Sequence, residues 1–396
     1  MKFKTIRDID LNNKRVLMRA DLNVPAKHAK VTDTTRIDRL KPTIDYLRKN
    51  GARTLILSHF GRPEGEQNPQ MSLAFLLPAL EQSWGTKVKF AQDCIGAKAE
   101  SLAASLQPGE IAILENVRFH KGEEANDPAF CKELAKNGDI YVNDAFSVSH
   151  RAHASTEGLA HLLPPAAGFL MEEELNALDS ALEHPKKPVA AIAGGSKIST
   201  KLKVLMNLVE RVDFLILGGG MANTFLHAQG ADVGMSLCEK NMAEEAKRIM
   251  DHAASKGCKI LLPIDSITVT SIQPGADYET HDSRKIPVDR MAIDVGPKTI
   301  QYILDETKDC KTLVWNGPMG VFEIKPFDAG TNALAVEAAK RTKQGLISVA
   351  GGGDTVAALE NAGAVDDFTY ISTAGGAFLE WLEGRTLPGV AALSQK

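Results

Sequence analysis

One repeated pattern in the second half of the chain limits what this sequence can fold into. Five short apolar runs each continue directly into a loop that contains glycine, at residues 189–193, 214–217, 313–315, 347–350 and 370–371. Longer helical patterns separate these runs, and strands that alternate with helices predict a parallel sheet covered on both faces. Ligands of open α/β sheets bind at the carboxyl ends of the strands, where such loops gather. We therefore expect a ligand site along one edge of this sheet.

The first half repeats the alternation of strand and helix. Apolar runs at residues 15–18, 54–57 and 111–114 predict strands, and residues 37–49 predict a helix that ends before Gly51. The chain has 396 residues, and at about 150 residues per domain it is long enough for two or three domains. The sequence thus favours the α/β class, with a doubly wound, Rossmann-like parallel sheet in each half.

A predicted helix at residues 169–183 separates the two halves. Pro164 and Pro165 precede it, and Pro185 and Pro188 follow it. Proline is disfavoured inside helices and marks their ends, while the leucines of this segment recur at helical spacing. We therefore predict a first domain at residues 1–168, a linking helix at 169–185 and a second domain at 186–386.

Composition restricts the partners and the compartment. The 46 Lys and Arg residues are balanced by 50 Asp and Glu, for a formal net charge of -4, so no global basic field would hold nucleic acid or an anionic membrane. The first residues lack the apolar core of a signal peptide, and no stretch reaches the roughly 18 apolar residues of a membrane span. The five cysteines include no C-x-x-C pair, which is typical of reduced thiols that mostly pack. We expect a cytoplasmic protein.

The glycine loops of the second half predict a phosphate site. Glycine lets the backbone approach a ligand closely, and a helix that follows offers free N–H groups and its dipole. One such loop would indicate little more than a tight turn, but several loops at one sheet edge indicate a ligand. Neither G-x-G-x-x-G after a strand nor G-x-x-x-x-G-K-[ST] occurs, which disfavours a dinucleotide dehydrogenase and a P-loop enzyme.

Charged residues in these loops refine the prediction. Lys197 and Lys201 stand four apart at the opening of a predicted helix, so both ammonium groups could face one ligand; a solvated helix face is the alternative. Asp354 follows three glycines, where a carboxylate would repel phosphate unless a cation lay between them. Asp354 is therefore a candidate magnesium ligand, unless it only caps the next helix.

The first half carries a second set of polar residues beside its predicted strands. The set comprises Arg19, Asp21, Asn23, Arg36, His59, Arg62, Arg118, His120, His150, Arg151 and His153. Arginines that converge would bind a small polyanion through bidentate contacts. Zinc binding is an alternative role for His150 and His153, which have His161 nearby. However, no carboxylate or cysteine lies at the spacing expected of a further metal ligand. We therefore favour an anion site.

Six motifs, in order along the chain, resemble the phosphoglycerate kinase family. They are RADLNVP at 19–25, SHFGRP at 58–63, ENVRFH at 115–120, GGSK at 194–197, WNGP at 315–318 and GGGDT at 351–355. The resemblance covers essentially the whole chain. It implies reversible phosphoryl transfer between ATP with magnesium and the carboxylate of 3-phosphoglycerate, which forms ADP and 1,3-bisphosphoglycerate in glycolysis and gluconeogenesis. It also implies a monomer with a hinged cleft between its domains, and a tail at residues 387–396 that returns to the first domain.

The resemblance also implies site residues. Around 3-phosphoglycerate it implies Asp21, Asn23, Arg36, His59, Arg62, Arg118 and Arg151. Around the nucleotide it implies Gly195, Lys197, Lys201, Gly219, Asn316, Pro318, Glu323, Gly352, Gly353, Asp354 and Thr355, with Glu323 at the ribose and Asp354 at magnesium. As catalytic residues it implies Arg36, Lys197, Lys201, Gly375 and Gly376.

One position departs from the family pattern. Ala374 stands where the family usually has the first of three glycines after Ser-Thr. Because a non-glycine residue at positive φ is strained, we predict a negative φ for Ala374, with the N–H groups of Gly375 and Gly376 still available to a ligand.

The absence of a recognisable base motif agrees with this chemistry. A carboxylate acceptor is already ionised at neutral pH, so the enzyme need only position the substrates and neutralise charge. Two alternatives stay open. One is another kinase that phosphorylates a carboxylate, and the other is a catalytically silent nucleotide-binding protein.

Overall fold

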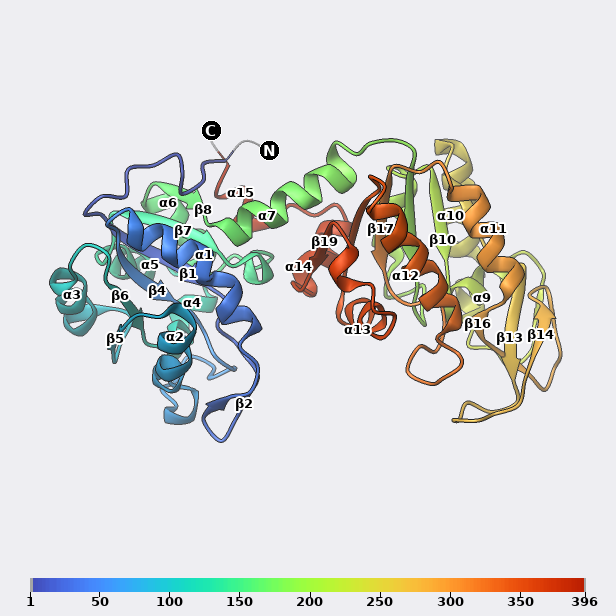
Figure 1. Cartoon of the computed structure of the whole chain (residues 1–396), viewed down its shortest axis with the longest axis horizontal. Coiled ribbons are helices and arrows are strands. Elements are labelled where there is room, and N and C mark those ends of the chain that lie inside the picture. The colour runs from blue at the N-terminus through green and yellow to red at the C-terminus, as the bar shows by residue number, and fades with distance from the viewer. Residues whose placement is uncertain (1–2, 395–396) are drawn as a thin grey trace. The chain divides into compact units, whose positions relative to one another are not determined.

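The computed structural model describes residues 3–394 and divides the chain into two compact units (Figure 1). One unit contains Met1–Leu175 together with Thr386–Lys396, and the other contains Asn176–Arg385. Each unit is built on a six-stranded sheet with its own helices. The chain is therefore an α/β protein with two doubly wound parallel sheets, as predicted.

The sheet of the first unit has the order β5-β6-β4-β1-β7-β8, and its neighbouring strands are all parallel. The strands are β1 Arg15–Ala20, β4 Arg53–Leu57, β5 Val88–Ala91, β6 Ile111–Leu114, β7 Ile140–Asp144 and β8 Pro165–Ala167. Its longer helices are α1 Thr35–Lys49, α2 Leu77–Trp84, α3 Gly96–Ser105 and α5 Pro128–Ala135.

Strand β1 shows why apolar residues follow one another in these strands instead of alternating with polar ones. Val16 and Met18 pack into the core on one face of the sheet, and Leu17 packs into a separate core on the other face. Both faces are covered by helices, so every position of the strand after Arg15 is buried.

The sheet of the second unit has the order β12-β10-β9-β17-β18-β19, again with parallel neighbours. The strands are β9 Val189–Ala193, β10 Phe214–Leu217, β12 Lys259–Leu261, β17 Thr312–Asn316, β18 Ile347–Gly351 and β19 Tyr370–Ser372. The helices are α8 Leu202–Val209, α9 Gly219–Ala228, α10 Ala243–Lys256, α11 Pro297–Thr307, α12 Ala329–Thr342, α13 Gly353–Asn361 and α14 Gly376–Leu382. A smaller antiparallel sheet adds β13 Asp265–Val269, β14 Tyr278–Asp282 and β16 Met291–Val295.

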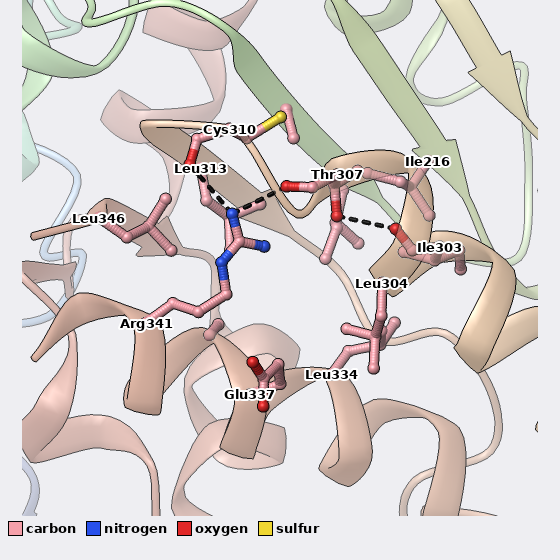
Figure 2. A pocket seen from close by; sticks show the side chains of 13 residues that line it. Ile216, Ile303, Leu304, Thr307, Cys310, Leu313, Leu334, Glu337, Arg341 and Leu346 are labelled. Carbon is pink, nitrogen blue, oxygen red and sulfur yellow. Dashed lines mark hydrogen bonds between the residues drawn. The ribbon is translucent and has the colours of Figure 1, made fainter. Parts of the chain in front are cut away.

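Helices α11 and α12 enclose an apolar recess beside the sheet (Figure 2). Ile303 and Leu334 line it from the two helices. Arg341 of α12 donates through Nη2 to the carbonyl oxygens of Thr307, at 2.8 Å, and Cys310, at 3.0 Å. These carbonyls lie at the end of α11, where a cation satisfies free acceptors and the helix dipole. Arg341 therefore caps one helix from its neighbour.

The chain passes between the units through α7. This helix runs over Phe169–Leu178, and a π-helical turn at Asp179–Glu183 extends it. After the second unit, α15 Pro388–Ala391 lies in the first unit, where the N–H of Gly389 donates to the carbonyl of Ser149 at 2.9 Å. Of the predicted tail at 387–396, residues 395 and 396 lie outside the described part, as do residues 1 and 2 of the predicted first domain. No helix within residues 3–394 has the length and apolar character needed to cross a bilayer.

Candidate active site

A buried arginine and a histidine form the base of the polar cluster in the first unit. Arg19 of β1 is 1% exposed, and its Nη2 lies 2.9 Å from Nδ1 of His59, just beyond β4. Its Nε donates to Oγ of Ser155 at 2.9 Å. Ser155 in turn donates its backbone N–H to the buried carboxylate of Glu123 at 3.0 Å. The network fixes the His59 ring and gives the buried guanidinium a counter-charge.

The imidazoles of His59 and His153 are neutral at physiological pH. Burial and the charge of Arg19, followed by that of Arg118, lower the pKa of His59 far below its ordinary range. Burial and the charges of Arg118 and Arg151 lower the pKa of His153 to about 4. Because an arginine guanidinium can only donate, Nδ1 of His59 accepts and the ring proton sits on Nε2. Several cations therefore converge here without a matching number of anions, which favours an anionic ligand.

Arg118 is held by the loop that follows β6. Asn116 caps a 3₁₀ turn at Val117–Phe119 by accepting the N–H of Arg118 at 3.1 Å. Nη1 of Arg118 donates to the carbonyl of Gly61 at 3.0 Å, and its Nε lies 3.4 Å from Glu124. The turn thus directs a buried guanidinium toward the loop that carries His59.

Arg36 and two other predicted residues form a second contact group in the same unit. Arg36 lies in the first turn of α1, and its Nη1 donates to Asp21 at 2.8 Å and to the carbonyl of Asn23 at 3.0 Å. Oδ1 of Asn23 accepts the N–H of Gly61 at 3.1 Å. The Arg36 side chain remains 39% exposed, so it can still reach a ligand.

Arg62 and Arg151 are less tightly held. Both are exposed, and Nε of Arg151 lies 3.3 Å from Nε2 of His150. Arg62 makes no ion pair or side-chain hydrogen bond within residues 3–394. The structure therefore joins five of the seven predicted residues, Asp21, Asn23, Arg36, His59 and Arg118, to one set of loops and leaves these two arginines exposed at its surface.

In the second unit, the glycine loops meet around Asn316. Nδ2 of Asn316 donates to the carbonyl of Gly351 at 2.7 Å, and its carbonyl accepts the N–H of Gly194 at 2.9 Å. Gly317 donates its N–H to Oγ1 of Thr355 at 2.7 Å. Loops that follow β9, β17 and β18 are thus joined directly, as the sequence pattern predicts for one sheet edge.

At two positions of this edge the backbone lies so close to a facing loop that only glycine fits. A Cβ on Gly194 would lie 1.8 Å from the carbonyl oxygen of Pro318. Gly219 has φ +68°, and a Cβ there would lie 2.6 Å from the carbonyl oxygen of Gly195. Neither position can hold a side chain without moving the loop that faces it.

Lys201 is a partly buried cation at this edge. Its Nζ donates to the carbonyl of Gly194 and to Oδ1 of Asn316, both at 2.7 Å. Burial lowers the pKa of Lys201 to about 8, and the charge of Asp354 opposes the shift. The ammonium is therefore mostly charged at neutral pH, while burial makes it responsive to a nearby anion.

The prediction that Lys197 and Lys201 open one helix is wrong. Helix α8 begins at Leu202 with Lys201 as its N-cap, and Lys197 lies in the preceding turn. Oγ1 of Thr200 donates to the carbonyl of Lys197 at 3.0 Å, and Ser199 donates to Glu239. Such side-chain bonds satisfy the backbone locally and compete with helix formation.

The remaining predicted residues lie at the ends of the last strands. Asp354 is exposed in the first turn of α13, and Gly352 occupies the N-cap, so the alternative that Asp354 caps this helix is wrong. Glu323 is exposed on the loop after β17. Gly375, with φ +45°, is the N-cap of α14, which begins at Gly376. Ala374 does not have a positive φ, as predicted.

Comparisons with known proteins agree with this geometry. The family model described as phosphoglycerate kinase matches residues 6–385. The chain belongs to the phosphoglycerate kinase family. It is 58% identical to the phosphoglycerate kinase of Rhizobium meliloti, with all of both chains covered, and 56% identical to that of Rhodospirillum centenum, with 99% of this chain and 100% of the relative covered.

Two solved structures extend the comparison. The phosphoglycerate kinase of Coxiella burnetii matches with a TM-score of 0.93 and 43% identity over 99% of both chains. That of Pyrococcus horikoshii matches with a TM-score of 0.78 and 31% identity over 98% of both chains. The chain is accordingly a phosphotransferase of this family, with the activity of a phosphoglycerate kinase.

Two residues of the predicted anion set are not among those that the family resemblance implies. Arg19 and His153 contribute to the field around His59. The buried position of Arg19 inside an apolar strand supports its place in that set, because a cation of this kind is rarely buried without a partner.

Proposed function

We propose that the first unit binds 3-phosphoglycerate and the second binds ATP or ADP, and that phosphoryl transfer runs between these two substrates. The single observation that supports the proposal is that one chain contains two sites of different chemistry. One is a cationic cluster around His59 and Arg118, and the other is a set of glycine loops joined through Asn316.

The proposed substrate site combines charge with neutral donors. Arg118 would supply a buried positive charge for the phosphate, and Arg62 and Arg151 would add exposed cations. His59 would donate from Nε2, because its Nδ1 already accepts from Arg19. Asp21 and Asn23 would bind the hydroxyl group and hold Arg36 beside the reacting carboxylate.

The proposed nucleotide site uses the backbone of the glycine loops. Gly195, Gly219, Gly352, Gly353, Gly375 and Gly376 would offer close approach or free N–H groups to the phosphates. Lys197 and Lys201 would add charge, Pro318 and Thr355 would shape the loops, and Glu323 would bind the ribose.

Magnesium fits the donor set at this edge. Asp354 is an exposed carboxylate at the start of α13, among backbone groups suited to phosphate. A magnesium ion usually takes one or two carboxylates together with substrate phosphates and waters. Asp354 would hold the ion beside the nucleotide phosphates, where its charge would help to neutralise them. We assign Asp354 as the protein ligand.

The proposed mechanism requires no protein base. The acceptor carboxylate of 3-phosphoglycerate is ionised at neutral pH and attacks the terminal phosphorus directly. Charge that develops on the transferring group would be met by Arg36 and Lys201, with N–H groups from Gly375 and Gly376. We also propose that the protein is cytoplasmic and monomeric.

A coupled turnover assay tests this function. With ATP, magnesium and 3-phosphoglycerate, we expect ADP to form and to depend on all three components. Acetate in place of 3-phosphoglycerate should give no comparable rate, which separates this activity from that of another carboxylate kinase. ATP binding without turnover would instead support a silent nucleotide-binding protein.

A further inference from the structure

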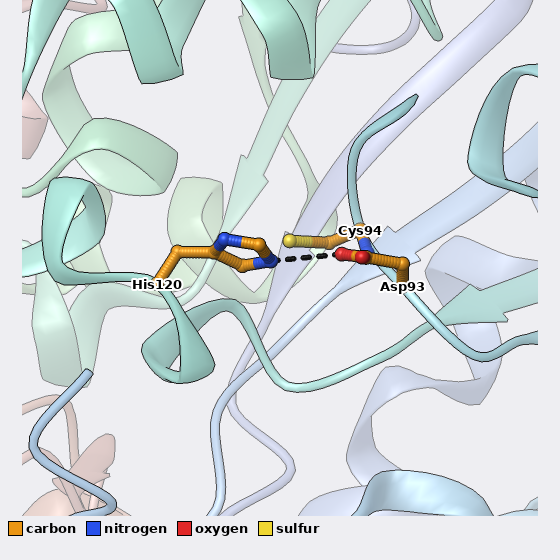
Figure 3. Close-up of side chains that lie close together, drawn as sticks. All are labelled: Asp93, Cys94 and His120. Carbon is orange, nitrogen blue, oxygen red and sulfur yellow. Dashed lines mark hydrogen bonds and ion pairs between the residues drawn. The ribbon is translucent and has the colours of Figure 1, made fainter. Parts of the chain in front are cut away.

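Three side chains with metal-binding atoms meet in the first unit, apart from the residues assigned to phosphoryl transfer (Figure 3). Asp93 and Cys94 lie between β5 and α3, and His120 directly precedes α4, which covers Lys121–Glu124. One donor atom from each residue lies within 4.8 Å of the others. Nε2 of His120 and Oδ1 of Asp93 are 2.8 Å apart.

The sheet brings these residues together. Strands β5 and β6 are parallel neighbours, with Ala91 opposite Leu114. The segments that follow them therefore leave the sheet at the same edge, and one carries Asp93 and Cys94 while the other carries His120. This proximity depends on strand pairing and not on spacing in the sequence.

Packing and hydrogen bonds hold the three residues in place. Oδ1 of Asp93 accepts the backbone N–H of Cys94 at 2.7 Å. Asn137 of the first unit donates through Nδ2 to the carbonyl of Cys94 at 3.3 Å. The ring of His120 packs against Phe130, with centroids 5.2 Å apart. The donor atoms are therefore arranged before any ion arrives.

Burial differs across the cluster. Cys94 is fully buried, and no hydrogen bond uses its Sγ within residues 3–394. The side chains of Asp93 and His120 are 29% and 27% exposed. An ion could therefore enter from the solvent side and reach a thiol that has no other polar partner.

We propose that Asp93, Cys94 and His120 form a binding site for a thiophilic divalent cation of the Zn²⁺ class, with water as the fourth ligand. One oxygen, one sulfur and one imidazole nitrogen suit zinc, whereas magnesium and calcium prefer oxygen alone. The site is thus chemically distinct from the one at Asp354.

The geometry needs only small adjustments. Zinc bonds of about 2.0 to 2.3 Å in a tetrahedron place donor atoms roughly 3.3 to 3.6 Å apart. The Asp93–His120 pair, at 2.8 Å, must open by about half an ångström, and no other pair, all being within 4.8 Å, need close by more than about 1.5 Å. Binding releases the thiol proton of Cys94 to solvent. The ring proton of His120 moves to Nδ1, so one proton leaves per ion bound.

Cobalt titration of the full-length chain, stripped of metal with chelator, tests the site. We expect one equivalent of Co²⁺ to produce a thiolate-to-cobalt charge-transfer band that Zn²⁺ removes and excess Mg²⁺ does not. Cys94→Ser should abolish the band. His120→Gln should weaken Co²⁺ affinity at least about tenfold, because even residues that only orient a metal ligand carry effects of this size. Cys238→Ser, which alters a partly exposed thiol outside the cluster, is the matched control and should keep the band.

The same titrations can overturn the proposal. No charge-transfer band with the wild-type chain, a band that persists in Cys94→Ser, or a band lost in Cys238→Ser would each exclude this site. Because Cys94 is buried, its variant could fail to fold. In that case His120→Gln and Asp93→Asn decide, and unchanged Co²⁺ affinity in both would reject the assignment.

Discussion

Replacing Gly194 with Ala should damage nucleotide use through the backbone alone. The added Cβ would lie 1.8 Å from the carbonyl oxygen of Pro318, whereas real Cβ atoms essentially never come within 3.0 Å of such an atom. The two loops must therefore separate by at least 1.2 Å, the difference between these distances. A displacement of about 1 Å in a catalytic arrangement can reduce the rate about 100-fold.

We therefore expect Gly194→Ala to lower kcat/KM for ATP at least about 100-fold, and to lower the free energy of unfolding by about 1–3 kcal/mol, as overpacking does. The affinity for 3-phosphoglycerate should not change, because its proposed residues belong to the other unit. Steady-state kinetics, calorimetric titration and urea unfolding measure the three quantities.

Gly353→Ala is the matched control for stability. A Cβ on Gly353 meets no atom within 4 Å, and its φ is not positive, so the free energy of unfolding should stay within about 1 kcal/mol of the wild-type value. Wild-type kcat/KM for ATP in Gly194→Ala would refute the steric reasoning.

Three further predictions follow from the site. Asp354→Ala should lower turnover strongly and leave 3-phosphoglycerate binding nearly intact; a magnesium titration of turnover checks this, and unchanged magnesium dependence would remove Asp354 as a ligand. Arg36→Lys should lower kcat and kcat/KM together, and Arg36→Met should lower them further, by about 10³-fold; a rise in KM alone would make Arg36 a simple substrate contact. Folding lowers the pKa of His153 from 6.5 to about 4, so the unfolded chain binds more protons between these values and stability should fall as pH drops from 6.5 towards 4. Urea unfolding across this range should show a shallower pH dependence for His153→Gln, and an unchanged slope would contradict the shift.

The sequence predicts the sheets well because their signals are local. Strands β6, β9 and β10 have the predicted bounds, since each is an uninterrupted apolar run that ends at a loop. The joined glycine loops were also predictable, because the carboxyl ends of parallel strands share an edge. Local patterns therefore predicted the fold class and the sheet edge at which the glycine loops meet.

Other features depend on tertiary contacts that local patterns do not contain. Lys197 stands at helical spacing from Lys201, but bonds made by Ser199 and Thr200 keep it in a turn. His120 and Asp93 meet only because β5 pairs with β6. Neighbouring parallel strands are connected by crossover helices, so the spacing of residues along the chain does not reveal which strands pair.

Binding titrations of both substrates to two variants test the central claim most directly. The claim is that each unit binds its own substrate, so Arg118→Met should lose 3-phosphoglycerate affinity and retain ATP affinity. Lys201→Met should show the reverse pattern. Loss of ATP binding in Arg118→Met, or of 3-phosphoglycerate binding in Lys201→Met, in variants that unfold at the wild-type urea concentration, would contradict the assignment of the two sites.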